Sequence, residues 1–182
     1  MKLPFFTIGH SSRSLEEFVE LLNDVGTELV ADVRKVPKSM ANPQFDKDTL
    51  PDALAAFDIS YEHIAALGGL RGRTRSVRSE INGLWKNESF HNYADYALSL
   101  QFHAGFEHLL DEGRHRRCVI MCAEAVWWRC HRRIVADYLI ASGETVFHIM
   151  GQGRLEPARL TPGAVIRAGS MVVYPAANPS DG

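Results

Sequence analysis

The sequence has no long apolar stretch. No run approaches the roughly 20 consecutive apolar residues that a membrane-spanning helix requires. The N-terminus, MKLPFFTIGH, carries one lysine and a short apolar stretch broken by proline, without the longer apolar region and small-residue cleavage site of a secretory signal. These absences argue against a membrane partner and make the cytoplasm the expected location.

Cysteine and net positive charge are scarce as well. Three cysteines among 182 residues do not make a disulfide framework, and reduced thiols fit the cytosol. The formal net charge is −2, so no global positive field predicts nucleic-acid binding. Any anion-binding function must therefore come from local clusters of basic residues.

Short apolar runs alternate with amphipathic segments along the chain. Ser14 and Glu17 form a capping-box start for a helix, and Gly26 is a natural helix end. Strand, helix and strand within about 30 residues make a βαβ unit with parallel strands. We expect strands at 5–10, 28–34, near 60–64, 118–123 and 145–150. We expect one helix that begins at residue 14 and three others at 47–57, 90–112 and 131–142.

This alternation predicts an α/β fold, in which a mainly parallel sheet is flanked by helices. The composition, 46% hydrophobic and 23% charged, is ordinary for a globular protein, and we expect one domain over residues 1–182. The tail from about residue 151 is rich in glycine, proline and alanine and is expected to be irregular. Within it MVVY is a candidate edge strand, and the last few residues are expected to be disordered.

Polar residues follow three of the expected strands. In open α/β sheets, ligand sites form at the carboxyl ends of the strands. The residues expected to meet there are His10, Asp32, Arg34, Cys122, Glu124 and the run 130–133.

Cys130 and His131 lie where a helix is expected to begin. Backbone N–H groups and the helix dipole at such a position favour an anion, including a thiolate or a phosphate. Neighbouring arginines, Arg132 among them, add positive charge, so Cys130 is a candidate nucleophile with a depressed pKa. Cys122 continues an apolar strand, and either cysteine is equally consistent with an inert buried thiol.

A metal site is a further alternative. Cys122, Glu124, Cys130 and His131 are chemically plausible ligands. The spacing Cys-x7-Cys-His, however, differs from the closely spaced pairs that zinc sites prefer. The sequence therefore predicts no particular metal or cofactor.

The stretches after the first two strands offer groups for acid–base chemistry and binding. His10 titrates near neutral pH, and Ser11 and Ser39 supply hydroxyl groups. Asp32 has a placement typical of catalytic aspartates. The alternative is that Asp32 only pairs with an arginine or caps local backbone.

A basic loop lies in the middle of the chain. LGGLRGRTRSVRS (67–79) holds four arginines, including Arg71, without the GxxxxGK[ST] order of a P-loop. It is either a mobile cover for an anionic ligand or a solvated loop. Trp85 follows, and an aromatic among basic residues suits base stacking in nucleic acid, although core packing explains one tryptophan equally well.

Several of these stretches together resemble the domain-of-unknown-function 488 family. TIGHSSRSLEEF, DVRKVPKSMANPQF, LGGLRGR, NGLWKNESFHNYADYAL and MCAEAVWWRCHRRIVADYL follow in the family's order, over about residues 5–175. The resemblance implies membership but no reaction. The signature residues that it implies here are His10, Ser11, Asp32, Arg34, Pro37, Ser39, Phe45, Gly68, Gly69, Trp85, Cys122, Glu124, Cys130, His131 and Arg132. The chain departs from the family pattern at His91, Asn92, Ala158 and Arg159.

Two functions are consistent with these residues. The first is an enzyme acting on a phosphate-bearing substrate, a nucleotide or nucleic acid; the alternative is a non-catalytic module that binds the same anionic ligand. A third interpretation is that carboxylate–arginine pairs merely tie the loops together. The candidate catalytic residues are His10, Asp32, Cys122, Glu124, Cys130 and His131, and the candidate substrate-binding residues are Ser11, Arg34, Ser39, Arg71, Trp85 and Arg132.

Overall fold

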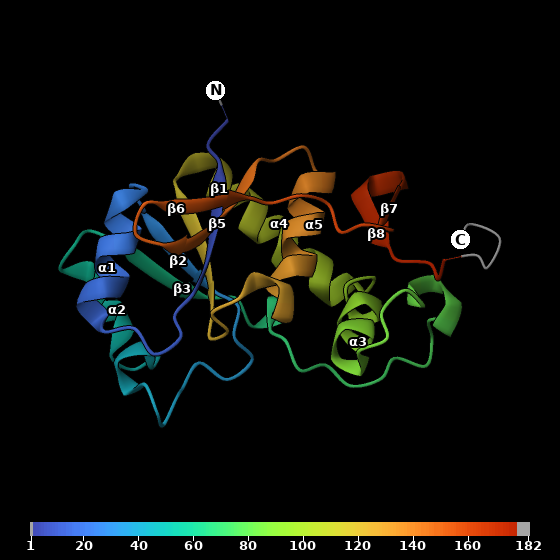
Figure 1. The fold of residues 1–182 in the computed structure, drawn as a ribbon, viewed down its shortest axis with the longest axis horizontal. Helices are drawn as coiled ribbons and strands as arrows, with labels where there is room; N and C mark the ends of the chain where they lie inside the picture. Colours follow the sequence, from blue (N-terminus) through green and yellow to red (C-terminus); the bar gives the residue numbers. More distant parts are fainter. Residues whose placement is uncertain (1, 178–182) are drawn as a thin grey trace.

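A six-stranded sheet lies at the centre of the computed structural model, which describes residues 2–177 (Figure 1). Its strand order is β3-β2-β4-β1-β5-β6. The strands are β1 (Phe5–Gly9), β2 (Leu29–Asp32), β3 (Ser60–His63), β4 (Cys118–Cys122), β5 (Val146–Gly151) and β6 (Arg154–Pro157). The helices are α1 (Leu15–Asp24), α2 (Leu50–Ala55), α3 (Glu88–Tyr96), α4 (Leu100–His115) and α5 (Arg132–Ala141).

Within this sheet β1 to β5 all run parallel to one another, and β6 pairs antiparallel with β5. The chain is thus an α/β protein with a mainly parallel sheet, as predicted. The predicted strands and the βαβ unit of β1, α1 and β2 are confirmed, with ends that differ by one to a few residues. Because β4 lies between β1 and β2, the carboxyl ends of these three strands are neighbours.

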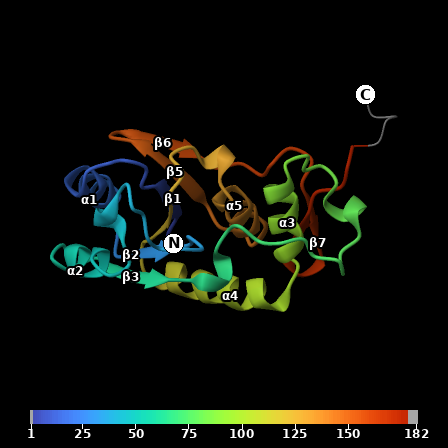
Figure 2. The same ribbon diagram turned by 90° about the horizontal axis from the view of Figure 1, so that it is seen from below.

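Helices cover both faces of the sheet (Figure 2). Successive side chains of a strand point to opposite faces, and β4 shows this directly. Val119 and Met121 pack with α1 and α2, whereas Cys118, Ile120 and Cys122 pack with α3, α4 and α5. Cys122 therefore faces the α5 side of the sheet.

The first helix begins and ends at the predicted residues. The Ser14 hydroxyl accepts a hydrogen bond from the backbone N–H of Glu17 at 3.1 Å, which satisfies one of the free donors of the first turn. Gly26 takes a left-handed backbone conformation, with φ of +68°, immediately after the helix.

The single helix predicted over 90–112 is wrong, because the structure has two helices there. Ala97 ends α3, and Ser99 begins α4 by accepting a hydrogen bond from the N–H of Phe102 at 3.2 Å. Apolar and aromatic residues continue across the break and are buried on both sides of it. Because their helical spacing is uninterrupted, the sequence pattern did not indicate Ser99 as a helix cap.

The tail is more regular than expected. It supplies the edge strand β6 and a separate two-stranded sheet of β7 (Val165–Arg167) and β8 (Met171–Val173). The MVVY segment therefore pairs with β7 and is not an edge of the main sheet. The expected disorder of the last few residues concerns 178–182, which lie outside the described residues.

A helix that crosses a bilayer must be long and apolar. None of the helices between residues 2 and 177 is both long enough and apolar enough to cross a membrane.

Candidate functional site

A pocket of about 470 Å³ opens where β1, β2 and β4 end. The predicted residues that line it are His10, Arg34, Ser39, Cys122, Glu124, Cys130 and His131. The sheet register explains this meeting, because Gly9 pairs with Cys122 and Asp32 with Met121 across parallel strands. The expected convergence of chemistry at the strand ends is therefore present.

The thiols of Cys122 and Cys130 contact each other in the pocket wall. Their Sγ atoms lie 2.7 Å apart, and both cysteines are reduced. Cys122 ends β4, while Cys130 lies between a short 3-10 turn (Trp127–Arg129) and α5. Both are almost fully buried, so water has little access to either thiol.

Arg132 is the cation that faces this thiol pair. Its side chain is fully buried, and its Nη1 donates to Cys122 Sγ and to the Glu124 carbonyl oxygen, each at 2.6 Å. Its Nη2 donates to the Ala125 carbonyl oxygen at 3.2 Å, and its buried Nε has no acceptor among the described residues. No carboxylate in the described part of the chain forms an ion pair with it.

A buried arginine without a counter-charge costs several kcal/mol. The backbone carbonyls around Arg132 supply only partial charge. The adjacent thiols are the groups that can provide a full negative charge by losing one proton. The packing of Arg132 therefore favours a thiolate in the pair.

The two thiols differ in acidity. Burial raises the pKa of Cys122 well above its ordinary value, and the hydrogen bond with Cys130 raises it further. Burial also acts to raise the pKa of Cys130, but the hydrogen bond from Cys122 and the charge and N–H groups of Arg132 outweigh it. The pKa of Cys130 is thus lowered while that of Cys122 is raised, so Cys130 is the more acidic thiol of the pair.

His131 offers a proton acceptor to Cys130. The His131 Nε2 lies 2.7 Å from the Val33 carbonyl oxygen, which can only accept, so Nε2 carries the ring proton. The unprotonated Nδ1 then faces Cys130 Sγ at 3.6 Å. Burial lowers the pKa of His131, so the ring is neutral at neutral pH and its Nδ1 can accept a hydrogen bond from Cys130.

Gly69 allows the His131 ring to occupy this position. A Cβ on Gly69 would lie 2.8 Å from His131 Nδ1 and 3.1 Å from two of its ring carbons. Such distances are shorter than real contacts, so any side chain at residue 69 displaces the ring. The glycine in the LGG stretch is therefore a steric requirement of the site.

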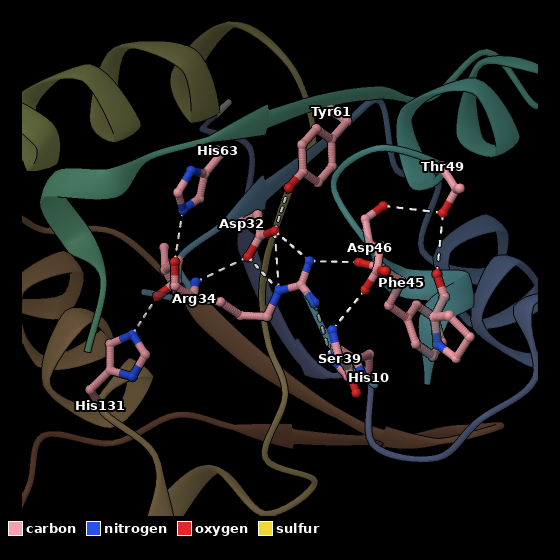
Figure 3. A network of polar contacts seen from close by, with 12 residues as sticks. His10, Asp32, Arg34, Ser39, Phe45, Asp46, Thr49, Tyr61, His63 and His131 are labelled. Atoms are coloured by element: carbon pink, nitrogen blue, oxygen red, sulfur yellow. Dashed lines mark hydrogen bonds and ion pairs between the residues drawn. The ribbon is translucent and has the colours of Figure 1, made fainter. Parts of the chain in front are cut away.

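Asp32 and Arg34 form the second part of the site, on the α1–α2 side (Figure 3). The Arg34 Nε and Nη2 donate to the two carboxylate oxygens of Asp32 at 3.0 and 2.7 Å, and Nη2 also donates to the Phe45 carbonyl oxygen at 2.7 Å. The Tyr61 hydroxyl donates to the same carboxylate. Asp32 is fully buried and paired with arginine, the alternative that the sequence left open.

His10 connects this pair to the pocket. Its Nδ1 donates to the Ser11 carbonyl oxygen at 2.8 Å, so its Nε2 accepts from Arg34 Nη1 at 3.3 Å. Burial lowers the pKa of His10, and its ring stacks on Phe45 with centroids 4.4 Å apart. Both ring nitrogens are occupied, so His10 is better placed to orient Arg34 than to act as a free base.

Charged groups at the pocket rim are mostly positive. Lys35, Lys38 and Arg129 are exposed residues that line it, and Lys38 is held only by an exposed ion pair with Asp48 at 3.4 Å. Glu124 is the one acid in the lining, and its Oε1 accepts from the Val126 N–H at 3.4 Å. An anionic ligand therefore meets more positive than negative charge.

The remaining predicted residues lie outside the pocket lining. Ser11 donates its backbone N–H to the Ala123 carbonyl oxygen, and Arg71 binds the carbonyl oxygens of Gly68 and Ala65. Trp85 stacks on Phe90, with centroids 4.8 Å apart. Asp32 and Arg132 do not line the pocket, but they contact the lining residues Arg34 and Cys122.

Sequence reasoning assigned no catalytic or binding role to part of the lining. These residues are Lys35, Val36, Lys38, Gly69, Leu70, Ser89, Phe90, Tyr93, Ala123 and Arg129, of which Gly69 was named only as a signature residue of the family. Lys35, Lys38 and Arg129 stand within predicted strand-end stretches, so their charge was a usable signal. Ser89, Phe90 and Tyr93 come from α3, whose approach to this edge nothing in the sequence indicates.

One group of possible metal ligands lies elsewhere. Glu62, His108 and Glu112 each place a ligand atom within 4.8 Å of the others, the one such group found among residues 2–177. Ion pairs already explain it, because His108 contacts Glu62 at 2.6 Å and Glu112 pairs with Arg116 at 2.7 Å. At the thiols, the guanidinium of Arg132 opposes a metal cation.

Comparison with known proteins places the chain in a family. Searches of curated proteins and of solved structures gave no match. The family described as "Domain of unknown function DUF488" matches residues 14–139, well over half of the chain. The matched segment contains Asp32, Arg34, Cys122, Cys130 and Arg132, and it begins after His10. The chain therefore belongs to the DUF488 family.

Proposed function

We propose that the pocket is the active site of an enzyme that acts on a phosphate-bearing substrate, a nucleotide or nucleic acid, with the Cys130 thiolate as nucleophile. The observation that carries this proposal is the contact of Arg132 with the thiol pair. A fully buried guanidinium that has thiols in place of a carboxylate favours a thiolate in a pocket that a ligand can enter.

Each neighbour of Cys130 has a distinct role in this proposal. Cys122 donates its S–H to the thiolate and Arg132 balances its charge, while His131 Nδ1, 3.6 Å from Cys130 Sγ, is the hydrogen-bond acceptor for the Cys130 thiol proton before that proton is lost. Glu124 is exposed at the rim, where it can exchange a proton with a leaving group or with water. Asp32 contributes indirectly, because it holds Arg34 in the pocket wall.

The size and lining of the pocket support this choice of substrate class. A volume of about 470 Å³ suits a small molecule or a single nucleotide, and not the face of a duplex. Lys35, Lys38 and Arg129 suit a phosphate group at the rim. Phe90 and Tyr93 form an aromatic part of the wall that suits a base.

A non-catalytic binding module is the second candidate, and one observation favours it. Asp32 is fully paired with Arg34, so one of the expected acid–base groups serves only to orient an arginine. Glu124 differs, because no arginine among the described residues pairs with it. A free carboxylate beside a thiolate favours catalysis over binding alone.

The test combines protection and turnover. Wild-type protein and Cys130→Ser are incubated with nucleoside mono-, di- and triphosphates and with short single-stranded oligonucleotides. Iodoacetamide labelling of Cys130 is then followed by mass spectrometry, and the compounds are analysed by chromatography. We expect one class to protect Cys130 in the wild type and to be converted by it, but not by Cys130→Ser.

Two results would count against this function. Protection without conversion, with unchanged ligand affinity in Cys130→Ser, would make the protein a binding module. Labelling of Cys130 that no phosphate-bearing compound slows would overturn the substrate class.

A further inference from the structure

A second cavity, here called the basic pocket, lies near the pocket that Cys122 and Cys130 line, here called the thiol pocket. It has a volume of about 750 Å³. Its lining comes from the arginine-rich loop and from the start of α3, and consists of Arg73, Thr74, Arg75, Val77, Arg78, Ser79, Trp85, Lys86, Glu88, His91, Asn92 and Asp95. The proposed reaction makes no use of these residues.

The basic pocket has an excess of available positive charge. Arg73, Arg75 and Lys86 are exposed and form no ion pair with the described residues. Arg78 has one partner, Glu80 at 3.5 Å, and both of these side chains are largely exposed, which makes the pair weak. The cations are therefore free to bind an anion.

The acids of the basic pocket do not neutralise these cations. Asp95 is 4% exposed, and its carboxylate accepts from Asn82 Nδ2 at 2.7 Å and faces His91 Nε2 at 3.5 Å. Glu88 is the one exposed acid in the lining. A protein of net charge −2 thus concentrates positive charge at this cavity.

Trp85 adds a donor that lacks a partner. Its indole Nε1 is buried and has no acceptor among the described residues. An unsatisfied buried donor is destabilising, and because Trp85 lines the basic pocket a ligand oxygen there is a candidate acceptor. Arg133 lies over the same ring, 5.2 Å from its centroid, and adds positive charge behind the wall.

Residues that are close in the chain line the two pockets. Leu70 lines the thiol pocket and Arg73 the basic pocket, and three residues of chain span at most about 11 Å. The first turn of α3 is shared in the same way, with Ser89 in the thiol pocket and Glu88 in the basic pocket. A ligand with several linked phosphates can therefore reach both.

We propose that the basic pocket is a second phosphate-binding site, which holds the phosphodiester backbone of a single-stranded nucleic acid next to the nucleotide that enters the thiol pocket. Arginine keeps its charge at neutral pH, and its planar fork of N–H groups matches phosphate oxygens. Several cations on one short loop suit a chain of phosphates better than one isolated phosphate. The second part of this inference rests on the proposed function; the phosphate site itself does not.

The experiment compares two double variants that remove equal charge. Arg73→Ala/Arg75→Ala alters the basic pocket, whereas Arg154→Ala/Arg159→Ala alters exposed arginines of the tail that line neither pocket. Binding of a fluorescein-labelled 12-nucleotide single strand is measured by anisotropy between about 50 and 300 mM KCl. Binding of AMP is measured in parallel by protection of Cys130 from iodoacetamide.

We expect Arg73→Ala/Arg75→Ala to weaken oligonucleotide binding about tenfold or more at 100 mM KCl. Each lost phosphate contact on a single strand makes the negative slope of log affinity against log salt shallower by about 0.7, so the two substitutions together reduce its magnitude by about 1.4. The control variant and the affinity for AMP stay close to wild type.

Three results would overturn the inference. They are absence of salt-dependent oligonucleotide binding in the wild type, equal losses in the two double variants, and a loss of AMP binding as large as that of the oligonucleotide. The last of these would assign the cavity to a free nucleotide. Failure of AMP and oligonucleotide to protect Cys130, with oligonucleotide binding still lost in Arg73→Ala/Arg75→Ala, would overturn the proposed function and leave the phosphate site standing.

Discussion

The guanidinium of Arg132 donates to the Sγ of Cys122 at 2.6 Å, inside a wall that water does not reach. Cys122 in turn contacts Cys130, so one buried positive charge acts on two thiols. The two thiols differ in acidity, because the loss of one proton from the pair is enough to balance the charge of Arg132. This arrangement makes Cys130 the more acidic thiol and Cys122 its hydrogen-bond donor.

Arg132→Met removes the charge and keeps an apolar side chain of similar length. We expect the apparent pKa of Cys130 to rise, because the charge that opposes burial is lost. The rate of alkylation by iodoacetamide at pH 7, followed at Cys130 by mass spectrometry, then falls about tenfold. Arg132→Lys retains a charge and should fall between the two. An unchanged pH profile in Arg132→Met would refute the role of Arg132.

His131→Phe removes the proton acceptor and keeps a ring that packs against Tyr93. We expect slower alkylation of Cys130 at pH 6–8, because the thiol proton loses its acceptor, and a rate close to wild type at pH 10, where the thiol ionises unaided. The same measurement at each pH separates this effect from damage to the fold. A rate lowered equally at every pH would indicate a structural role only.

Gly69→Ala tests the steric demand of the His131 ring. The new Cβ would lie 2.8 Å from Nδ1, so the ring must move away from Cys130. We expect the alkylation profile of Cys130 to approach that of His131→Phe, while the melting temperature changes little. Gly72→Ala, in the same loop with no atom within 4 Å of its Cβ, is the matched control and should behave as wild type.

Asp32→Asn breaks the buried pair with Arg34. We expect a loss of about 3–5 kcal/mol in the free energy of unfolding, because a buried guanidinium is left without its counter-charge. Asp48→Asn breaks the exposed pair with Lys38 and should cost less than about 1 kcal/mol. Urea denaturation measures both, and similar losses in the two variants would contradict the buried pairing.

His148 makes the protein sensitive to acid. Burial, with a smaller effect of Arg132, lowers the pKa of His148 from 6.5 to about 3. Between these pH values the unfolded chain binds more protons than the folded one. The contribution of His148 to the free energy of unfolding is therefore complete above pH 6.5 and declines as the pH falls. The decline reaches up to about 1.4 kcal/mol per pH unit for this group.

His148→Gln removes the titrating ring and keeps a polar partner for the Thr7 hydroxyl, which lies 2.6 Å from His148 Nδ1. We expect a shallower fall of unfolding free energy between pH 6.5 and 4 than in the wild type. His10 and His131, whose pKa values burial also lowers, leave a residual slope. Urea denaturation at half-unit pH steps checks this. Parallel curves for wild type and His148→Gln would show that His148 does not contribute.

Local patterns predicted the framework of the protein well. Ser14, Glu17 and Gly26 mark the ends of α1, and the apolar runs mark five parallel strands, because caps and strand periodicity act within a few residues. The same kind of signal failed at Ser99, where an uninterrupted apolar face concealed a helix break. The rule that sites form at the carboxyl ends of strands brought His10, Arg34, Cys122 and Cys130 together correctly.

By itself, the sequence determined the α/β class, the family and the residue types that gather at the strand ends, since these depend on local patterning and chain order. Only the tertiary structure decided what each residue does. It paired Asp32 with Arg34, placed Arg132 against two thiols without a carboxylate, and turned His131 Nδ1 toward Cys130. These outcomes depend on distances between segments far apart in the chain and on exclusion of water. A thiol acquires its acidity from such three-dimensional surroundings, which no local pattern encodes.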